Sequence, residues 1–270
     1  MFSTLVHKWL KVPYLLNLHV FNNPRHPRAT VLLIHGIGAS WRTWERIAPK
    51  LPTDVRVIAI DLLGFGDSPK PHWKTYDVRT QVDSIATTLL RKGIFGPIFI
   101  VGHSLGSLVS VELARRYPQT IKSLVLCSPP FYIPTSKEKF YHPEAFLRRF
   151  YRMLHNNPIQ TAQLLKIADE RRLWPDPGYS MDEAGTMTFL ATLDAAIVNQ
   201  TSIDEAIELK LPILVIYGKL DPFIIEKNIK YLAKHNSHVA LTTLPYAAHD
   251  MRGGYITTLA RAITATLDAY

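Results

Sequence analysis

Five residues in the first half of the chain, Gly102-His103-Ser104-Leu105-Gly106, constrain its fold more than any other feature. They follow an apolar run that ends at Val101 and precede a helical pattern over Ser107–Tyr117. A G-x-S-x-G pattern between a strand and a helix predicts a sharp, strained turn that presents the serine hydroxyl at the edge of a sheet. Because glycine and serine are common, the flanking strand and helix are what make this prediction specific.

Two further polar residues follow apolar runs in the order that a reactive serine requires. Asp221 comes just after the run 212–217, and His249 follows the run 238–244. A serine hydroxyl becomes a good nucleophile when a base accepts its proton, and that base needs an acid to orient it. Loops that follow parallel strands meet at the same edge of a sheet. We therefore predict that Ser104, His249 and Asp221 form a catalytic triad.

A glycine-rich turn supplies the remaining part of the predicted site. The near-continuous apolar run 29–34 leads directly into His35-Gly36-Ile37-Gly38. Such a turn can direct the backbone N–H of Ile37 at an oxygen that gains negative charge, and the N–H of Leu105 can serve as the second donor. The sequence thus predicts an oxyanion hole made by these two amides.

Several other polar residues in the same regions are expected to have structural roles. His35 is interpreted as a structural hydrogen-bonding residue rather than a base, His103 as a residue with a structural role, and Asp61 and Asp67 as turn residues. Asp250 is a weaker candidate for the acid than Asp221, because a residue adjacent to His249 cannot easily orient that imidazole. No His, Cys or Asp cluster has the spacing of a metal site, and no glycine-rich nucleotide motif is present. We expect neither a metal nor a cofactor.

Apolar runs alternate with helical patterns along most of the chain, which predicts a mostly parallel sheet flanked by helices. Strands are expected at 29–34, 55–60, 97–101, 123–127, 212–217 and 238–244, with an antiparallel strand at Tyr14–Val20. Helices are expected at about 77–92, 105–117, 223–235 and 254–268. The alternation breaks between 130 and 208, where helical signals replace strands. We therefore predict a core from 1–129 and 209–270, interrupted by an all-helical insertion at 130–208.

Taken together, these motifs resemble the α/β-hydrolase family. The resemblance rests on His35–Gly38, the loop Asp61–Ser68, the turn at 102–106, Asp221 and His249. It implies an α/β-hydrolase fold in which the insertion is a cap that excludes water and lines the substrate cavity. The cap's aromatic side chains suggest an apolar cavity; they are Phe131, Tyr132, Phe146, Phe150, Tyr151, Trp174 and Phe189.

The resemblance implies a serine hydrolase that cleaves a small, apolar carboxylic ester through an acyl-enzyme. Members of the family with the same triad also cleave carbon–carbon bonds, open lactones or use peroxide as the acyl acceptor. His103 and Ser107 favour ordinary acyl chemistry, because carbon–carbon hydrolases often have asparagine and glycine at these positions. A ligand-binding protein without activity is the alternative from a different class.

Charge and cysteine content limit the partners and the compartment. The net charge is +9, but the basic residues are scattered and no nucleic-acid-binding motif is present, so we expect no nucleic-acid partner. The N-terminal segment 1–11 is basic and amphipathic; docking on its own domain is favoured over contact with an anionic membrane. One cysteine, no membrane-spanning run and no signal-peptide pattern favour a cytoplasmic location. The oligomeric state is left open.

Overall fold

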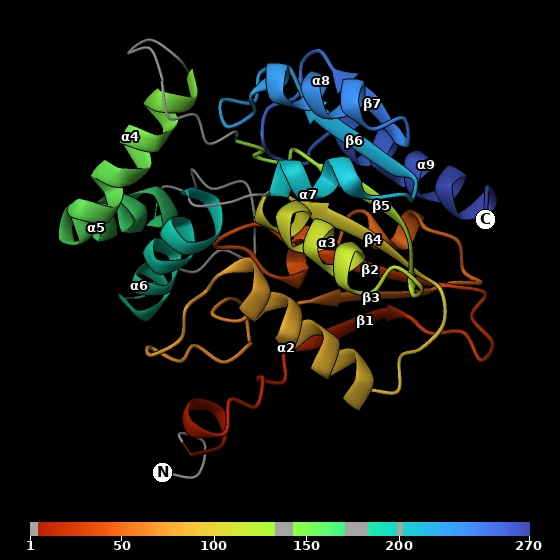
Figure 1. Ribbon diagram of the computed structural model, residues 1–270, viewed down its shortest axis with the longest axis horizontal. Coiled ribbons are helices and arrows are strands. Elements are labelled where there is room, and N and C mark those ends of the chain that lie inside the picture. The colour runs from red at the N-terminus through yellow and green to blue at the C-terminus, as the bar shows by residue number, and fades with distance from the viewer. Residues whose placement is uncertain (1–4, 133–142, 171–182, 199–201) are drawn as a thin grey trace.

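The computed structural model of the protein describes residues 5–132, 143–170, 183–198 and 202–270. Within these residues, a seven-stranded sheet has the order β1-β3-β2-β4-β5-β6-β7 (Figure 1). The strands are β1 (Leu18–Asn22), β2 (Thr30–Ile34), β3 (Arg56–Ile60), β4 (Ile98–His103), β5 (Ile121–Cys127), β6 (Ile213–Gly218) and β7 (Val239–Leu244). Strands β2 to β7 are parallel, and β1 pairs antiparallel with β3.

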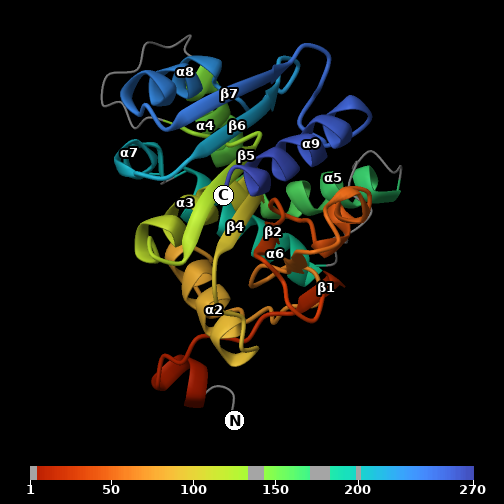
Figure 2. The same cartoon turned by 90° about the vertical axis from the view of Figure 1, so that its right-hand side faces the viewer.

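The described α-helices either cover the two faces of this sheet or lie beside it. They are α2 (Val78–Arg91), α3 (Leu105–Arg116), α4 (Pro143–Asn156), α5 (Pro158–Glu170), α6 (Glu183–Thr192), α7 (Ser202–Glu208), α8 (Glu226–His235) and α9 (Gly254–Asp268). Leu32 and Ile34 of β2 share a core cluster with residues of α2, α3 and α8, whereas Val31 and Leu33 share another with α9. Figure 2 accordingly shows α9 on the opposite side of the sheet from α3 and α8. This two-sided burial explains why β2 is apolar throughout.

The predicted fold class is confirmed, and each predicted parallel strand is present, but the first strand is displaced. We predicted it at Tyr14–Val20, whereas β1 spans Leu18–Asn22. Tyr14 and Leu16 are buried beside α2 instead, where the backbone N–H of Leu16 donates to Oγ1 of Thr88 (2.9 Å). Their apolar side chains therefore serve the helix-covered core rather than a strand pairing.

The insertion contributes helices to two places. Helices α4, α5 and α6 group together beside the sheet (Figure 1), and α4 reaches the segment that follows β5 through Tyr151, whose hydroxyl lies 3.1 Å from that of Tyr132. Helix α7 packs instead against α3 and α8 of the core. The all-helical character of the described part agrees with the predicted cap, while the division of the chain at 130 and 208 stays a prediction.

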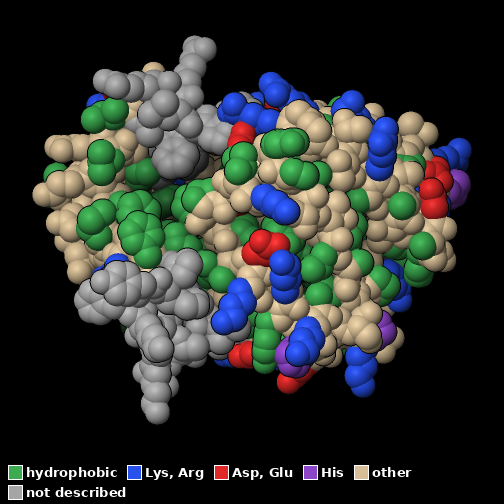
Figure 3. Space-filling view, turned by 90° about the horizontal axis from the view of Figure 1, so that it is seen from above, with side chains coloured by type: hydrophobic (Ala, Val, Ile, Leu, Met, Phe, Trp, Pro, Cys, Tyr) green, Lys and Arg blue, Asp and Glu red, His purple; other side chains and the backbone are tan. Residues whose placement is uncertain are grey.

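The aromatic side chains of the insertion do not all face inward. Phe131, Tyr132, Tyr151 and Phe189 are buried, but Phe146 is 68% exposed. Trp174 lies outside the described residues. Figure 3 shows hydrophobic side chains gathered at the cap end of the molecule. The apolar cap cavity predicted from the sequence can thus be lined by only part of these aromatic side chains.

Among the described residues, no helix combines the length and hydropathy that crossing a membrane would need.

Candidate active site

Ser104 lies on a strained turn between β4 and α3, as its sequence context predicts. Its backbone dihedral angles are φ 51° and ψ −118°, in a region that non-glycine residues rarely adopt. A methyl group on Gly102 would lie 2.4 Å from the carbonyl oxygen of Gly106, and one on Gly106 would lie 2.2 Å from that of Ile34. Both glycines are therefore required by close backbone contacts. The turn leaves the side chain of Ser104 at the carboxyl end of a central strand.

Asp221 and His249 are brought together by loops that follow β6 and β7. Nδ1 of His249 donates to Oδ2 of Asp221 at 2.8 Å, and the other carboxylate oxygen accepts the backbone N–H of Phe223 at 3.0 Å. The two loops also touch directly, because the backbone N–H of Leu220 donates to the carbonyl of Ala247 (3.0 Å). With Nδ1 protonated, Nε2 of the neutral imidazole is left as the proton acceptor.

The imidazole of His249 lies next to the turn that carries Ser104. The ring of His103, the residue before Ser104, has its centroid 5.0 Å from that of His249. No hydrogen bond joins Ser104 to His249 among the described residues. Contacts of this kind often tighten only once substrate is bound. The structure thus brings the predicted acid and base into direct contact and sets the base beside the predicted nucleophile.

The glycine-rich turn after β2 lies against Ser104. A methyl group on Gly36 would lie 3.2 Å from the Cβ atom of Ser104. The carbonyl of Gly36 accepts hydrogen bonds from Nδ1 of His35 (2.7 Å) and the backbone N–H of Ala39 (3.3 Å). In a trans peptide the C=O and the following N–H point in opposite directions. Fixing the Gly36 carbonyl therefore also fixes the direction of the Ile37 N–H, one of the two predicted oxyanion donors.

His35 makes structural hydrogen bonds, as predicted. Its Nε2 accepts the backbone N–H of Leu62 at 2.9 Å, so the proton of the neutral ring must be on Nδ1, which donates to Gly36. The side chain is completely buried. With both ring nitrogens engaged by the backbone, His35 has no nitrogen left to act as a catalytic base.

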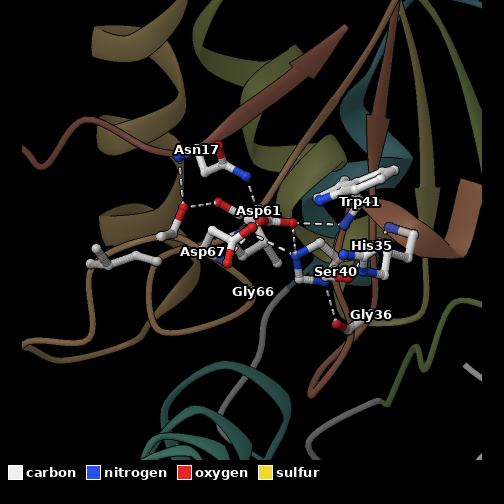
Figure 4. A network of polar contacts seen from close by, with 12 residues as sticks. Asn17, His35, Gly36, Ser40, Trp41, Asp61, Gly66 and Asp67 are labelled. Atoms are coloured by element: carbon white, nitrogen blue, oxygen red, sulfur yellow. Dashed lines mark hydrogen bonds and ion pairs between the residues drawn. The ribbon is translucent and has the colours of Figure 1, made fainter. Parts of the chain in front are cut away.

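Asp61 is the centre of a buried polar network beside this turn (Figure 4). One carboxylate oxygen accepts the backbone N–H of Trp41 (2.7 Å), and the other accepts the side-chain amide of Asn17 (2.8 Å) and the backbone N–H of Asp67 (2.9 Å). Gly66 packs so closely on the carboxylate that a methyl group there would lie 2.3 Å from it. Asp61 therefore ties the residue before β1, the segment after β2 and its own loop together, which agrees with its predicted turn role.

We expect Asp61→Asn to destabilise the fold. Three donors point at the two carboxylate oxygens, so an asparagine must direct its NH₂ group at one or more of them. Leaving buried donors unpaired in this way should cost about 2–4 kcal/mol of unfolding free energy, which corresponds to a fall in Tm of roughly 5–10 °C. Thermal unfolding followed by circular dichroism measures this fall.

Asp67→Asn is the matched control for this variant. The side chain of Asp67 is exposed, and its contribution to the network is a backbone N–H that the substitution keeps. Its Tm should stay within about 1–2 °C of the wild type, since surface substitutions rarely exceed 0.5 kcal/mol. Equal unfolding temperatures for Asp61→Asn and the wild type would show that the network does not stabilise the fold.

Tyrosine hydroxyls connect helix α4 to the loop that carries Asp221. The hydroxyl of Tyr132 donates to the carbonyl of Phe223 (3.0 Å) and meets the hydroxyl of Tyr151 on α4. Burial raises the pKa of Tyr151 to about 12, so this hydroxyl stays protonated. The ring of Phe223 packs edge-on against His249, with centroids 5.0 Å apart. The sequence marked both tyrosines only as cap aromatics, and nothing in their spacing indicated this connection.

A model of the α/β-hydrolase fold matches residues 29–251, a span that holds all five predicted site residues. The chain belongs to the α/β-hydrolase family. Its described parts contain no group of three or more His, Cys, Asp or Glu side chains arranged to hold a metal ion.

Relatives of this α/β hydrolase include proteins named for ester hydrolysis. A probable lysophospholipase, BODYGUARD 4 of Arabidopsis thaliana, is 36% identical over 116 residues, which cover 42% of this chain but only 28% of the plant protein. The pimeloyl-[acyl-carrier protein] methyl ester esterase of Aeromonas salmonicida is 30% identical over 236 residues, covering 81% of this chain and 87% of that enzyme. The crystal structure of a bromoperoxidase from Bacillus anthracis superposes with a TM-score of 0.74 at 19% identity, covering 94% of this chain and 95% of that one. That last similarity shows the fold alone.

Proposed function

We propose that this α/β hydrolase cleaves a small carboxylic ester through an acyl-enzyme formed on Ser104. The hydrogen-bonded pair of Asp221 and His249, set beside a serine with a positive φ angle, is the observation that carries the proposal. The names of the relatives, which include esterase, lysophospholipase and lipase, support the same reaction class.

In the proposed first step, the hydroxyl oxygen of Ser104 attacks the ester carbonyl while Nε2 of His249 accepts its proton. Asp221 stabilises the imidazolium that forms, and the N–H groups of Ile37 and Leu105 donate to the oxyanion. Collapse of the tetrahedral intermediate breaks the bond to the alkoxy oxygen, which takes the proton from His249 and leaves as the alcohol. The acyl group stays on Ser104.

In the second step, a water molecule attacks the acyl-enzyme and His249 accepts one of its protons. The same two amides stabilise the second tetrahedral intermediate, and its collapse releases the carboxylic acid and returns the proton to Ser104. Each oxyanion donor is expected to stabilise the transition state by about 3 kcal/mol. No cofactor enters either step.

A series of p-nitrophenyl esters from acetate to decanoate tests this proposal. We expect turnover with kcat/KM rising over the first members of the series, by up to about fourfold per added methylene, because each buried CH₂ contributes about 0.8 kcal/mol. A fluorophosphonate probe should label one site per chain, and peptide mapping should find the label on Ser104.

Other results would point to other functions. Labelling of Ser104 without ester turnover, but with turnover of a vinylogous diketone or a lactone, would favour those reactions on the same triad. A folded protein that neither reacts with the probe nor turns over any ester would contradict the proposal and favour a ligand-binding role.

A further inference from the structure

His103 connects the turn that carries the nucleophile to the loop that carries the base. Its Nε2 lies 2.9 Å from the backbone carbonyl oxygen of His249. A carbonyl only accepts, so Nε2 of His103 carries the proton and donates. His249 is thus held at two points. Asp221 accepts the proton of its ring Nδ1, and His103 donates to its backbone carbonyl.

His103, which donates this hydrogen bond, is itself held rigidly by its neighbours. His103 is the last residue of β4 and pairs with Cys127 of β5, and the next residue, Ser104, donates its backbone N–H to the Cys127 carbonyl at 2.9 Å. On its other side, the His103 ring closely approaches Gly36, where an added methyl group would lie 3.1 Å from Nδ1. The ring therefore sits between the oxyanion turn and the His249 loop, with little room to rotate.

A neutral His103 can donate this hydrogen bond without competing with His249 for the proton of Ser104. Loss of water around the ring and the neighbouring His249 lower the pKa of His103 to about 3. The ring is neutral at every pH at which a histidine-dependent hydrolase works, so it neither accepts the proton of Ser104 nor adds a positive charge beside the imidazolium of His249.

We propose that His103 is a positioning residue that sets the distance between Ser104 and His249 through its hydrogen bond to the His249 carbonyl. The inference rests on the proposed function, because it needs Ser104 as nucleophile and His249 as base. Ser104 and His103 are adjacent, so nucleophile and base share one anchor on β4. Without that contact, the base is placed only through its own loop and Asp221, which follow other strands.

A matched pair of variants tests the role of this hydrogen bond. In His103→Gln the side-chain amide can place a donor at the position of Nε2, whereas His103→Met has similar length and no donor. We expect kcat for p-nitrophenyl butyrate to fall by about 10- to 100-fold in His103→Met, because a misplacement of about 1 Å can cost this much, with KM changed less than about threefold. His103→Gln should recover most of the lost kcat.

Two further measurements separate positioning from a merely structural role. Thermal unfolding of both variants shows whether they lose stability equally. A proton NMR spectrum reports the Nδ1 proton of His249, whose hydrogen bond to the buried Asp221 gives a low-field signal; this signal should broaden or vanish in His103→Met and persist in His103→Gln. A structural role alone would lower Tm and leave kcat and this signal unchanged.

The outcomes also distinguish this inference from the proposed function. Wild-type turnover that survives unchanged in His103→Met, or that falls equally in both variants, would overturn the role of His103 and leave the triad intact. If the wild type hydrolyses no ester, the proposed function fails, and the His249 signal in the two variants still decides whether His103 holds that loop.

Discussion

Replacement of Ser104 with alanine is expected to lower kcat for ester hydrolysis by about 10⁶-fold, to the limit of detection. Loss of the nucleophile of a serine–histidine–aspartate triad has an effect of this size, because the remaining groups cannot form the acyl-enzyme. Any residual hydrolysis would come from the oxyanion hole and from binding, which alone give about 10³- to 10⁴-fold over water. The measurement is steady-state turnover of the best p-nitrophenyl ester, together with labelling by the fluorophosphonate probe.

The same substitution should leave the fold intact. Alanine has the same Cβ atom as serine at the positive φ angle of position 104, and no hydrogen bond from the serine hydroxyl is lost within the described structure. We therefore expect the unfolding free energy to change by less than about 1 kcal/mol. A loss of activity with an unchanged Tm would assign the effect to chemistry rather than to folding.

Ser110→Ala is the matched control for this variant. Ser110 lies further along α3, and its hydroxyl donates to the carbonyl of Gly106 within the same helix (2.6 Å). Its loss should leave kcat within about threefold of the wild type, because the hydroxyl takes no part in the proposed chemistry. Turnover by Ser104→Ala above about 1% of the wild-type rate would contradict the assignment of the nucleophile, since triad loss normally removes far more.

The parts of the fold that could be predicted from the sequence depend on local pattern. Central strands such as Thr30–Ile34 are buried on both faces, so their continuous apolar runs identify them. The antiparallel edge strand β1 was harder to predict, since Tyr14 and Leu16 continue the apolar pattern but pack beside α2. The helix predicted from 223 begins instead at Glu226, because the carboxylate of Asp221 holds the Phe223 N–H in a turn.

The candidate site likewise has parts that could be predicted from the sequence and parts that could not. Ser104, Asp221 and His249 could be proposed because each follows a strand in a recognisable motif. The contacts that hold these three residues in place could not be predicted, because such contacts join residues far apart in the chain. His103 and the His249 carbonyl are separated by 146 positions, and Tyr132 and Phe223 by 91. No local pattern encodes such pairs, so they emerge only from the packed structure.

Asp221→Asn is expected to reduce kcat by about 10³- to 10⁴-fold, the second largest effect we predict. Both carboxylate oxygens accept hydrogen bonds, one from His249 and the other from the Phe223 N–H. An asparagine can keep its oxygen on the backbone donor only by directing its NH₂ group at Nδ1 of His249. That contact requires Nδ1 to be unprotonated and moves the ring proton to Nε2, which then cannot accept the proton of Ser104.

Asp250→Asn discriminates between the two aspartates that could serve as the acid. Asp250 follows His249 directly, and its carboxylate pairs with the side chain of Arg252 at 2.6 Å. Its substitution should leave kcat within about threefold, because a partly exposed ion pair of this kind contributes about 1 kcal/mol or less. A larger loss in Asp250→Asn than in Asp221→Asn would transfer the role of the acid to Asp250. The expected order instead follows from geometry, since the buried Asp221 contacts the ring nitrogen whose proton decides which tautomer faces the serine.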